Sequence, residues 1–342
     1  MKTDVLSMTL SELTEYIISL GEPRYRAEQV WGWLYKGAKF ADMSNIPKTL
    51  VEKLEENAYV SAAEVKKKQV SRDGTVKYLF SLFDGETVES VLMSYKHGYT
   101  LCISSEVGCA MGCAFCASTI GGIVRKLAPS EMLAQIIAAQ NDAGVRISNV
   151  VMMGIGEPLD NYDNVIKFLR LVGDEKGLNI GYRHISLSTC GIVDKIYALA
   201  DEGFPITLSV SLHAHDDGMR SSLMPVNRRW NIEKLLASCR DYFEKTGRRI
   251  SFEYTLVKGK NDSERDAAAL ASVLKKHCGK MPLHVNLIPV NNVTERGFAP
   301  TERGGVEIFQ KTLEENRITA TVRRTLGSDI DASCGQLRAK NK

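Results

Sequence analysis

The sequence has no hydrophobic run that approaches the roughly 18 residues of a membrane-spanning helix. Its first residues also lack the basic segment and apolar core of a secretory signal. We therefore expect no membrane partner and a cytoplasmic location, where the eight cysteines are reduced. The net charge is only +3, which is too small to indicate nucleic-acid binding by itself.

Three cysteines with C-x3-C-x2-C spacing, Cys109, Cys113 and Cys116, form the strongest local feature. Structural zinc usually takes four protein ligands, and no second Cys or His pair lies nearby. Three thiolates at short, uneven spacing favour a cubane iron–sulfur cluster that keeps one iron without a protein ligand. Zinc with Cys102 or a distant fourth ligand, and unliganded or disulfide-paired thiols, stay open as alternatives.

From about residue 98, short β-branched runs alternate with amphipathic helical segments, a pattern typical of βα units around a parallel sheet. The expected strands span residues 100–105, 148–153, 184–189, 206–212, 250–257 and 284–289. The expected helices span residues 131–142, 163–171, 193–202, 232–245, 263–276 and 306–316. With a final strand at 319–325, six units predict an α/β fold, a partial (β/α)6 barrel that is open on one side.

The N-terminal part of the chain breaks this rhythm. Helical patterns occupy residues 10–20, 26–34 and 47–57, and alternating strand patterns occupy 78–83 and 87–94. We predict four units: an N-terminal helical domain at 1–60, a β-hairpin extension at 61–97, the barrel at 98–328 and a C-terminal tail at 329–342.

The cysteine triplet follows the first expected barrel strand, at the end of the barrel where active sites are built. Other polar groups follow later strands at the same end: Gly156, Glu157, Ser188, Ser211, His213 and Asn291. Each of these residues also has an ordinary structural explanation. The glycine loop could be a plain turn, and His213 could be a core histidine whose hydrogen bonds are made within the protein. Together we expect them to line one mouth, where Glu157 can accept a hydrogen bond from a ligand amine.

The triplet, with an aromatic residue before its last cysteine and a later Gly-Glu-Pro loop, resembles the radical S-adenosylmethionine enzymes. Cys102 and the segments 150–158, 211–214, 286–291 and 323–337 are similar, more narrowly, to the RlmN/Cfr family of RNA adenine methyltransferases. The resemblance covers nearly the whole chain. It implies a radical-SAM barrel preceded by an RNA-engaging accessory domain.

The resemblance also implies a [4Fe–4S] cluster on the triplet and two molecules of S-adenosylmethionine per turnover. The positions that match the cofactor-binding residues of the family are Gly156, Glu157, Ser188, Ser211, Leu212, His213 and Asn291. The implied substrates are adenines of large-subunit rRNA and tRNA, which must be flipped out or lie in a loop to be reached. A monomer served by an electron donor such as a flavodoxin system completes this expectation.

Three further residues take catalytic roles through the resemblance alone. Cys334 would carry a methyl group, which loses a hydrogen atom to the cofactor-derived radical and then adds to the adenine carbon. Glu89 would remove the proton bound to that carbon, and Cys102 would form a disulfide with Cys334 to release the product. Without the resemblance, all three have plain structural readings. The remaining cysteines match no family role and are expected to be packing residues: Cys190, Cys239 and Cys278.

Two alternatives remain at this point. The Cfr-type enzymes methylate C8 of adenine rather than C2 and share the cluster, Cys102 and Cys334, although the run 116–126 looks more like the C2 group. From another class, the chain could be a zinc-stabilised RNA-binding protein without catalysis. We expect the C2 methyltransferase.

Overall fold

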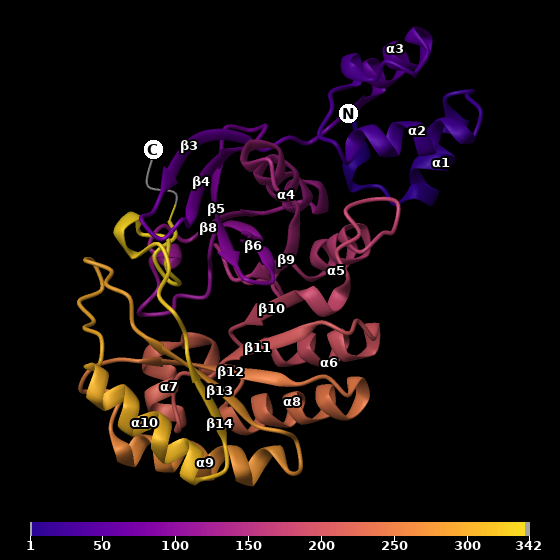
Figure 1. The fold of residues 1–342 in the computed structure, drawn as a ribbon. Coiled ribbons are helices and arrows are strands. Elements are labelled where there is room, and N and C mark those ends of the chain that lie inside the picture. The colour runs from indigo at the N-terminus through magenta and orange to yellow at the C-terminus, as the bar shows by residue number, and fades with distance from the viewer. Residues whose placement is uncertain (1, 339–342) are drawn as a thin grey trace.

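The structure, a computed structural model that describes residues 2–338, is built on one ten-stranded sheet. Residues 1 and 339–342, which belong to the predicted N-terminal domain and tail, lie outside the described residues. The strand order is β14-β13-β12-β11-β10-β9-β6-β5-β4-β3 (Figure 1). The parallel strands are β6 (Gly98–Cys102), β9 (Ile147–Met152), β10 (Ile185–Thr189), β11 (Thr207–Ser211), β12 (Ile250–Leu256), β13 (His284–Pro289) and β14 (Thr319–Val322).

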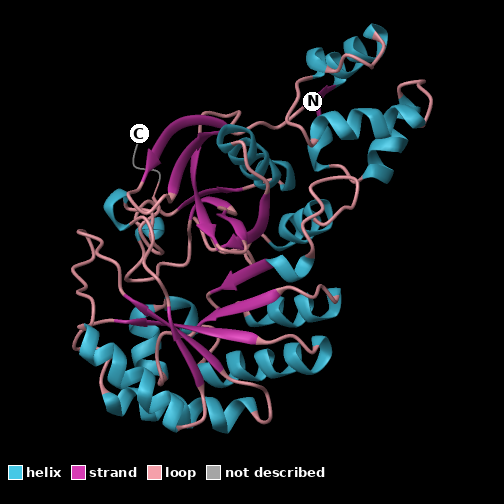
Figure 2. Ribbon diagram, viewed as in Figure 1, coloured by secondary structure: helices cyan, strands magenta, loops and turns pink. Residues whose placement is uncertain are grey.

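Helices connect these strands and cover one side of the sheet (Figure 2). They are α4 (Pro129–Ala143), α5 (Tyr162–Val172), α6 (Val193–Glu202), α8 (Ile232–Thr246), α9 (Glu264–Cys278) and α10 (Arg303–Glu315). The predicted series of βα units is confirmed, with element ends that differ by a few residues. Among residues 2–338, none of the helices combines the length and the apolar character that crossing a membrane requires.

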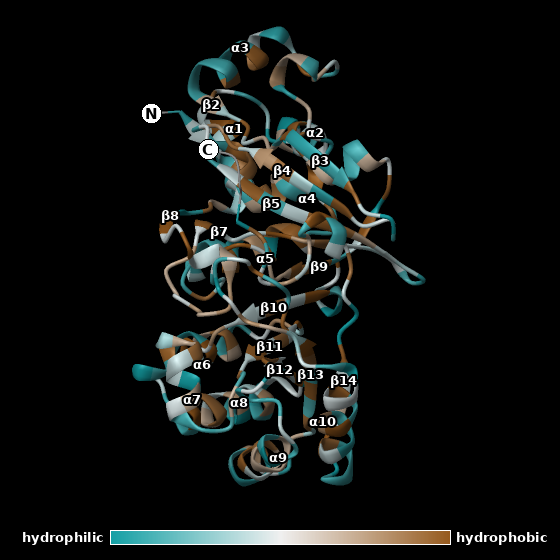
Figure 3. Cartoon of the chain, turned by 90° about the vertical axis from the view of Figure 1, so that its left-hand side faces the viewer, coloured by the Kyte–Doolittle hydropathy of each residue, from teal (hydrophilic) through white to brown (hydrophobic). Residues whose placement is uncertain are grey.

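Apolar and polar residues alternate along barrel strands such as β10, β11 and β12, so one face of the sheet carries the apolar side chains. Every residue of β12 is buried, and the strands carry hydrophobic stretches while the helices alternate between hydrophobic and hydrophilic ones (Figure 3). The amphipathic helices turn their apolar positions to the sheet, as Leu270 and Leu274 of α9 do with no exposed surface. One continuous core therefore fixes the strand ends from which the pocket loops leave.

The extension before the barrel differs from the expected hairpin. It has three antiparallel strands, β3 (Glu64–Val70), β4 (Val76–Ser81) and β5 (Thr87–Tyr95), and β5 pairs with β6, so the barrel sheet continues into it. The sequence pattern missed β3, because this edge strand is almost entirely exposed and carries three lysines in place of an apolar face. It also missed the seven-residue helix α7 (Asp217–Leu223) and the small hairpin of β7 (Glu106–Gly108) and β8 (Ile123–Lys126).

Three N-terminal helices confirm the predicted helical segments: α1 (Leu10–Ser19), α2 (Tyr25–Leu34) and α3 (Lys48–Asn57). A capping box between Thr9 and Glu12 fixes the start of α1. The Tyr35 hydroxyl donates to the Leu171 carbonyl of α5 at 3.2 Å, which ties this part of the chain to the barrel.

Candidate functional site

The loop between β7 and β8 carries the cysteine triplet, and backbone contacts hold it at two points. The Cys109 N–H donates to the Gly122 carbonyl at 2.9 Å, and the Ala114 N–H donates to the Leu223 carbonyl of α7 at 2.8 Å. Gly108 adopts φ +77°, and a Cβ there would lie 2.0 Å from the Gly122 oxygen, so only glycine fits. The start of the loop is therefore fixed by the close approach of two chain segments.

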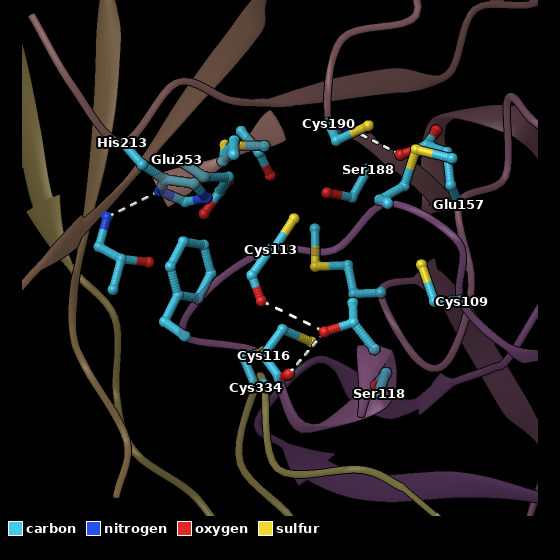
Figure 4. A pocket seen from close by; sticks show the side chains of 18 of the residues that line it. Cys109, Cys113, Cys116, Ser118, Glu157, Ser188, Cys190, His213, Glu253 and Cys334 are labelled. Carbon is cyan, nitrogen blue, oxygen red and sulfur yellow. Dashed lines mark hydrogen bonds between the residues drawn. The ribbon is translucent and has the colours of Figure 1, made fainter. Parts of the chain in front are cut away.

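All three thiols line one pocket at the carboxyl ends of the parallel strands (Figure 4). The pocket encloses about 970 Å³ of space free of protein atoms, part of it open to solvent, which is ample for a cofactor. Six of the seven predicted cofactor-binding residues line it: Gly156, Glu157, Ser188, Ser211, His213 and Asn291. Leu212 does not, because its side chain is fully buried in the hydrophobic core.

The Gly156–Glu157 turn follows β9 and packs against β7. Gly156 has φ +105°, and a Cβ there would lie 2.6 Å from the Glu106 Cβ. The Glu157 N–H donates to Glu106 Oε2 at 3.0 Å. The Glu157 carboxylate accepts from the N–H groups of Cys190 at 2.6 Å and Leu159 at 3.0 Å, so both of its oxygens already bind backbone. Burial raises the pKa of Glu157 although these bonds oppose the rise. The carboxylate thus joins two pocket loops.

His213, just after β11, has its ring fixed on both sides. Nδ1 accepts from the Thr255 N–H at 2.9 Å, so the ring proton lies on Nε2. The ring packs edge-on against Phe115 of the cysteine loop, with 4.9 Å between centroids. Asn261 holds the His213 carbonyl at 2.9 Å, which supports its left-handed φ of +56°. Burial lowers the pKa of His213 to about 3, so the imidazole stays neutral at physiological pH.

The C-terminal tail brings Cys334 into the same pocket as the triplet. The Asn291 Nδ2 donates to the Cys334 carbonyl at 2.9 Å. The next residues bind the cysteine loop: the Ala117 N–H donates to the Gly335 carbonyl at 2.7 Å. Two segments more than 200 residues apart in the chain are therefore held side by side, with a tail thiol facing the triplet.

Cys102 lies at the end of β6, outside the main pocket but close to the tail. It belongs to a small apolar cluster with Val91, Ile155, Ala332 and Leu337. Burial, followed by the proximity of Cys334, raises the pKa of the Cys102 thiol to about 12. Both cysteines are free thiols in this structure.

Glu89 on β5 faces the tail rather than the main pocket. Its carboxylate forms an ion pair with Lys77 at 2.8 Å and accepts from the Arg338 N–H at 2.7 Å. It points to the same face of β5 as Val91, which pairs with Cys102 across the sheet. Glu89, Cys102 and the tail thus gather on one side of the sheet, with tail backbone bound to the carboxylate.

Comparisons with known proteins agree with this geometry. The model of the radical SAM superfamily matches residues 103–271, and that of the ribosomal RNA large subunit methyltransferase N-terminal domain matches residues 3–60. A protein of Alkaliphilus oremlandii named probable dual-specificity RNA methyltransferase RlmN is 52% identical over 99% of this chain and 98% of its own length. One of the same name from Clostridium novyi is 51% identical over 98% of this chain and 97% of its own length. This chain belongs to the RlmN family.

A solved structure supports the same assignment. The radical SAM methyltransferase from Sphaerobacter thermophilus is 42% identical, with a TM-score of 0.94 over 99% of this chain and 100% of that chain. As a member of the radical SAM superfamily, this RlmN-family chain uses a [4Fe–4S] cluster and S-adenosylmethionine as cofactors. The resemblance seen in the sequence is confirmed.

The triplet fits such a cluster in its chemistry and its spread. Burial raises the pKa of the Cys109 thiol to about 12 and also raises the pKa values of Cys113 and Cys116, so the free thiols are neutral and metal binding must deprotonate them. Among residues 2–338, no three Cys, His, Asp or Glu side chains are grouped as ligands of a single metal ion. Three cysteines that line one pocket provide the thiolates that a four-iron cluster with one open iron needs.

The pocket of this RlmN-family chain also contains residues that sequence reasoning missed. Arg323 donates to the Met153 sulfur at 3.2 Å and lies 3.7 Å from Glu253, and the neighbouring Cys334 raises its pKa. Cys190, expected to be a packing residue, is buried in the core but also lines the pocket. One sequence signal pointed to this part of the pocket, because Glu253 is the charged residue of strand β12.

Proposed function

We propose that this chain methylates C2 of adenine in large-subunit rRNA and in tRNA through an S-methylcysteine on Cys334. One observation carries the proposal: the tail thiol of Cys334 and the three loop thiols line the same pocket. The names of the relatives, which are about half identical over the whole chain, support RNA as the substrate. The bound cluster and S-adenosylmethionine supply the radical chemistry that an unreactive ring carbon needs.

In this proposal Cys109, Cys113 and Cys116 hold the cluster, and the loops at the strand ends hold S-adenosylmethionine. The neutral His213 ring and the polar side chains are proposed to contact the cofactor: Ser188, Ser211 and Asn291. Gly156 lets the backbone approach closely, and Leu212 contributes through its backbone position beside His213. Because both Glu157 oxygens bind backbone amides, its proposed role at a ligand amine requires one of these bonds to be shared.

The covalent steps assign one role to each remaining residue. Cys334 sulfur receives the methyl group, and the carbon of that group forms the new bond to adenine after losing one hydrogen atom. Glu89 accepts the proton released from the ring carbon. The adduct would also give up its unpaired electron, which the oxidised cluster could take back. The Cys102 thiolate then attacks the Cys334 sulfur and the carbon–sulfur bond breaks; the carbon keeps the electron pair and takes up a proton to become the methyl group, and the two sulfurs form a disulfide.

The position of Glu89 adds one requirement to this scheme. Its side chain is 6% exposed and its carboxylate binds the N–H of Arg338, four residues beyond Cys334. An adenine can reach the carboxylate only after this part of the tail has withdrawn. We propose that RNA entry displaces residues 335–338 while Cys334 stays near the pocket.

The RNA-engaging unit, the electron donor, the cellular location and the oligomeric state are also proposed. The N-terminal unit 1–60 is proposed to engage RNA, which the match to an rRNA methyltransferase N-terminal domain supports. A one-electron donor such as a flavodoxin system would reduce the cluster. Because rRNA and tRNA are its proposed substrates, we place the enzyme in the cytoplasm, and we expect a monomer, which light scattering would test.

Mass spectrometry of rRNA and tRNA tests the function directly. Cells that lack the protein should gain 2-methyladenosine when complemented with it and should lose this gain with Cys334→Ala. The variant should still bind iron and cleave S-adenosylmethionine. A C8-methylated product would establish the Cfr-type alternative, and a colourless protein with stoichiometric zinc would establish the non-catalytic one.

A further inference from the structure

Arg220, on helix α7 behind the pocket, is a charged residue without any role so far. It has no exposed surface and is among the largest fully buried side chains of the described chain. Its Nη2 donates to the carbonyls of Cys190 at 2.7 Å and Ser211 at 3.0 Å, and Nε donates to the Leu212 carbonyl at 3.2 Å. The guanidinium therefore joins the loops that follow β10 and β11.

The charge of Arg220 has no counterion in the described structure. Within residues 2–338 no carboxylate lies within ion-pair distance of it, and its last contact is the neutral Asn227 Oδ1 at 2.9 Å. The nearby Asp217 instead binds Asn227 Nδ2 and the Ile232 N–H. A buried charge is costly unless it is paired, and carbonyl dipoles compensate it only in part. This arrangement indicates that the counterion of Arg220 is a nearby anion other than a carboxylate of the protein.

The cluster loop lies against the elements that carry Arg220. The last residue of α7, Leu223, accepts from the Ala114 N–H of the loop at 2.8 Å. Gly112 approaches Pro225, the residue that begins the turn after α7, and a Cβ there would lie 3.5 Å from the proline ring. Cys190, whose carbonyl binds Arg220, lines the pocket together with Cys113. The guanidinium thus binds the wall of the pocket that Cys113 lines, and its electrostatic influence reaches that thiol.

We propose that Arg220 is the fixed counter-charge of the cluster and favours its reduced state. A cluster held by three thiolates is anionic, and each electron taken from the donor adds one negative charge without a proton. A buried guanidinium that cannot move or be screened by water stabilises that added charge, because net charge around a cluster helps set its reduction potential. Arg220 is a positioning residue that does not touch the substrate. This inference rests on the cluster assignment proposed above.

The test is a reductive titration of the anaerobically loaded protein, followed by electron paramagnetic resonance and without S-adenosylmethionine. For scale, a unit charge at about 10 Å from a cluster, at an effective dielectric near 20, would change the equilibrium constant for one-electron reduction roughly tenfold. Arg220→Gln should therefore lower the reduction potential by about 59 mV for that tenfold change. Arg220→Lys keeps the charge but loses the several N–H donors of the guanidinium. Its reduction potential should stay close to that of the wild type, while its thermal stability should fall.

Two further variants provide a control and an independent check for this test. Arg248→Gln removes the same charge and a hydrogen bond to the Ile206 carbonyl at the opposite ends of the strands, and should leave the potential unchanged. Asn227→Asp combined with Asp217→Asn places a carboxylate beside an intact Arg220 without setting two carboxylates against each other. This double variant should lower the potential as Arg220→Gln does, so the question can be answered if the latter loads poorly.

Three results would overturn the proposal. Equal shifts in the Gln and Lys variants would mean that the hydrogen bonds, rather than the charge, matter. An unchanged potential in Arg220→Gln and in the Asn227→Asp, Asp217→Asn double variant would mean that Arg220 serves only to hold the loops together. If a second titration, run with S-adenosylmethionine, showed a shift that is absent without it, the charge of Arg220 would serve the cofactor carboxylate instead. Failure of the wild-type protein to bind iron would instead contradict the cluster assignment itself.

Discussion

Replacing Glu106 by glutamine should make the protein more stable above neutral pH. Glu106 lies on β7 with no exposed surface, three residues before the first cysteine of the triplet. Burial is the main cause that raises its pKa to about 8, and the carboxylates of Asp160 and Glu157 raise it further. Glutamine keeps a carbonyl oxygen for the Glu157 N–H, which now donates to Glu106 Oε2 at 3.0 Å.

The sign and size follow from proton linkage. The folded state holds the Glu106 proton up to about pH 8, whereas the unfolded chain loses it near its ordinary value of 4.5. The stabilisation is therefore complete below about pH 4.5 and is lost as pH rises towards 8. A tenfold difference in proton affinity between the folded and unfolded states corresponds to about 1.4 kcal/mol, so the wild type should lose about 3–5 kcal/mol across this window. A glutamine cannot ionise and should not share this loss.

Urea unfolding under anaerobic conditions measures the effect. The free energy of unfolding of Glu106→Gln minus that of the wild type should grow by about 3 kcal/mol or more between pH 5.5 and pH 8.5. Glu52→Gln, which removes an exposed carboxylate from α3, should give the same difference at both pH values. If the Glu106 difference were also independent of pH, the carboxyl would be ionised in the folded protein and our view of this pocket wall would be wrong.

Three further outcomes can be measured independently. Gly156→Ala should cost about 1–3 kcal/mol in backbone strain, besides the clash with Glu106, and weaken S-adenosylmethionine binding at least tenfold in equilibrium dialysis; unchanged affinity would contradict a close backbone contact. Asn261→Ala removes three hydrogen bonds around His213 and should lower the free energy of unfolding by about 3 kcal/mol, while a loss below about 1 kcal/mol would show that water replaces them. Cys102→Ala should accumulate protein covalently attached to RNA on denaturing gels, and absence of this adduct would argue against its proposed attack on Cys334.

Much of the barrel could be predicted because its signals are local. In strands such as Ile250–Leu256 apolar and polar residues alternate with the period of a strand, and the capping box of Ser263 and Asp266 marks the start of α9. Strand β3 could not be predicted, because its partner β4 and not its own lysine-rich pattern makes it a strand. Helix α7 is too short for a hydrophobic period to be recognised.

The functional site also has parts that the sequence predicts and parts that it does not. The spacing of the triplet marked a metal centre, and the position after each strand marked the pocket loops, since parallel strands all end at one edge. Nothing local distinguishes Glu89 from a solvated strand carboxylate or Cys102 from a core thiol, and only the family resemblance singled them out. Arg220 could not be predicted either. It is a charged residue on a short, partly polar helix, and nothing in that pattern indicates that it will be buried.

The extension and the cysteine loop both hold the C-terminal tail, on either side of the thiol that we propose as the methyl carrier. Before Cys334, the Gly327 N–H donates to Asp73 at 2.9 Å, and Ser71 donates to Asp329 at 2.6 Å, which anchors the tail on the turn between β3 and β4. After Cys334, the loop residue Ser118 donates to the Leu337 carbonyl at 2.6 Å. Because the upstream anchor does not involve Glu89 or the pocket, the downstream contact can open for RNA without releasing the tail. The antiparallel strands added to the barrel thus hold the part of the tail that precedes Cys334, which is what the proposed role of this thiol requires.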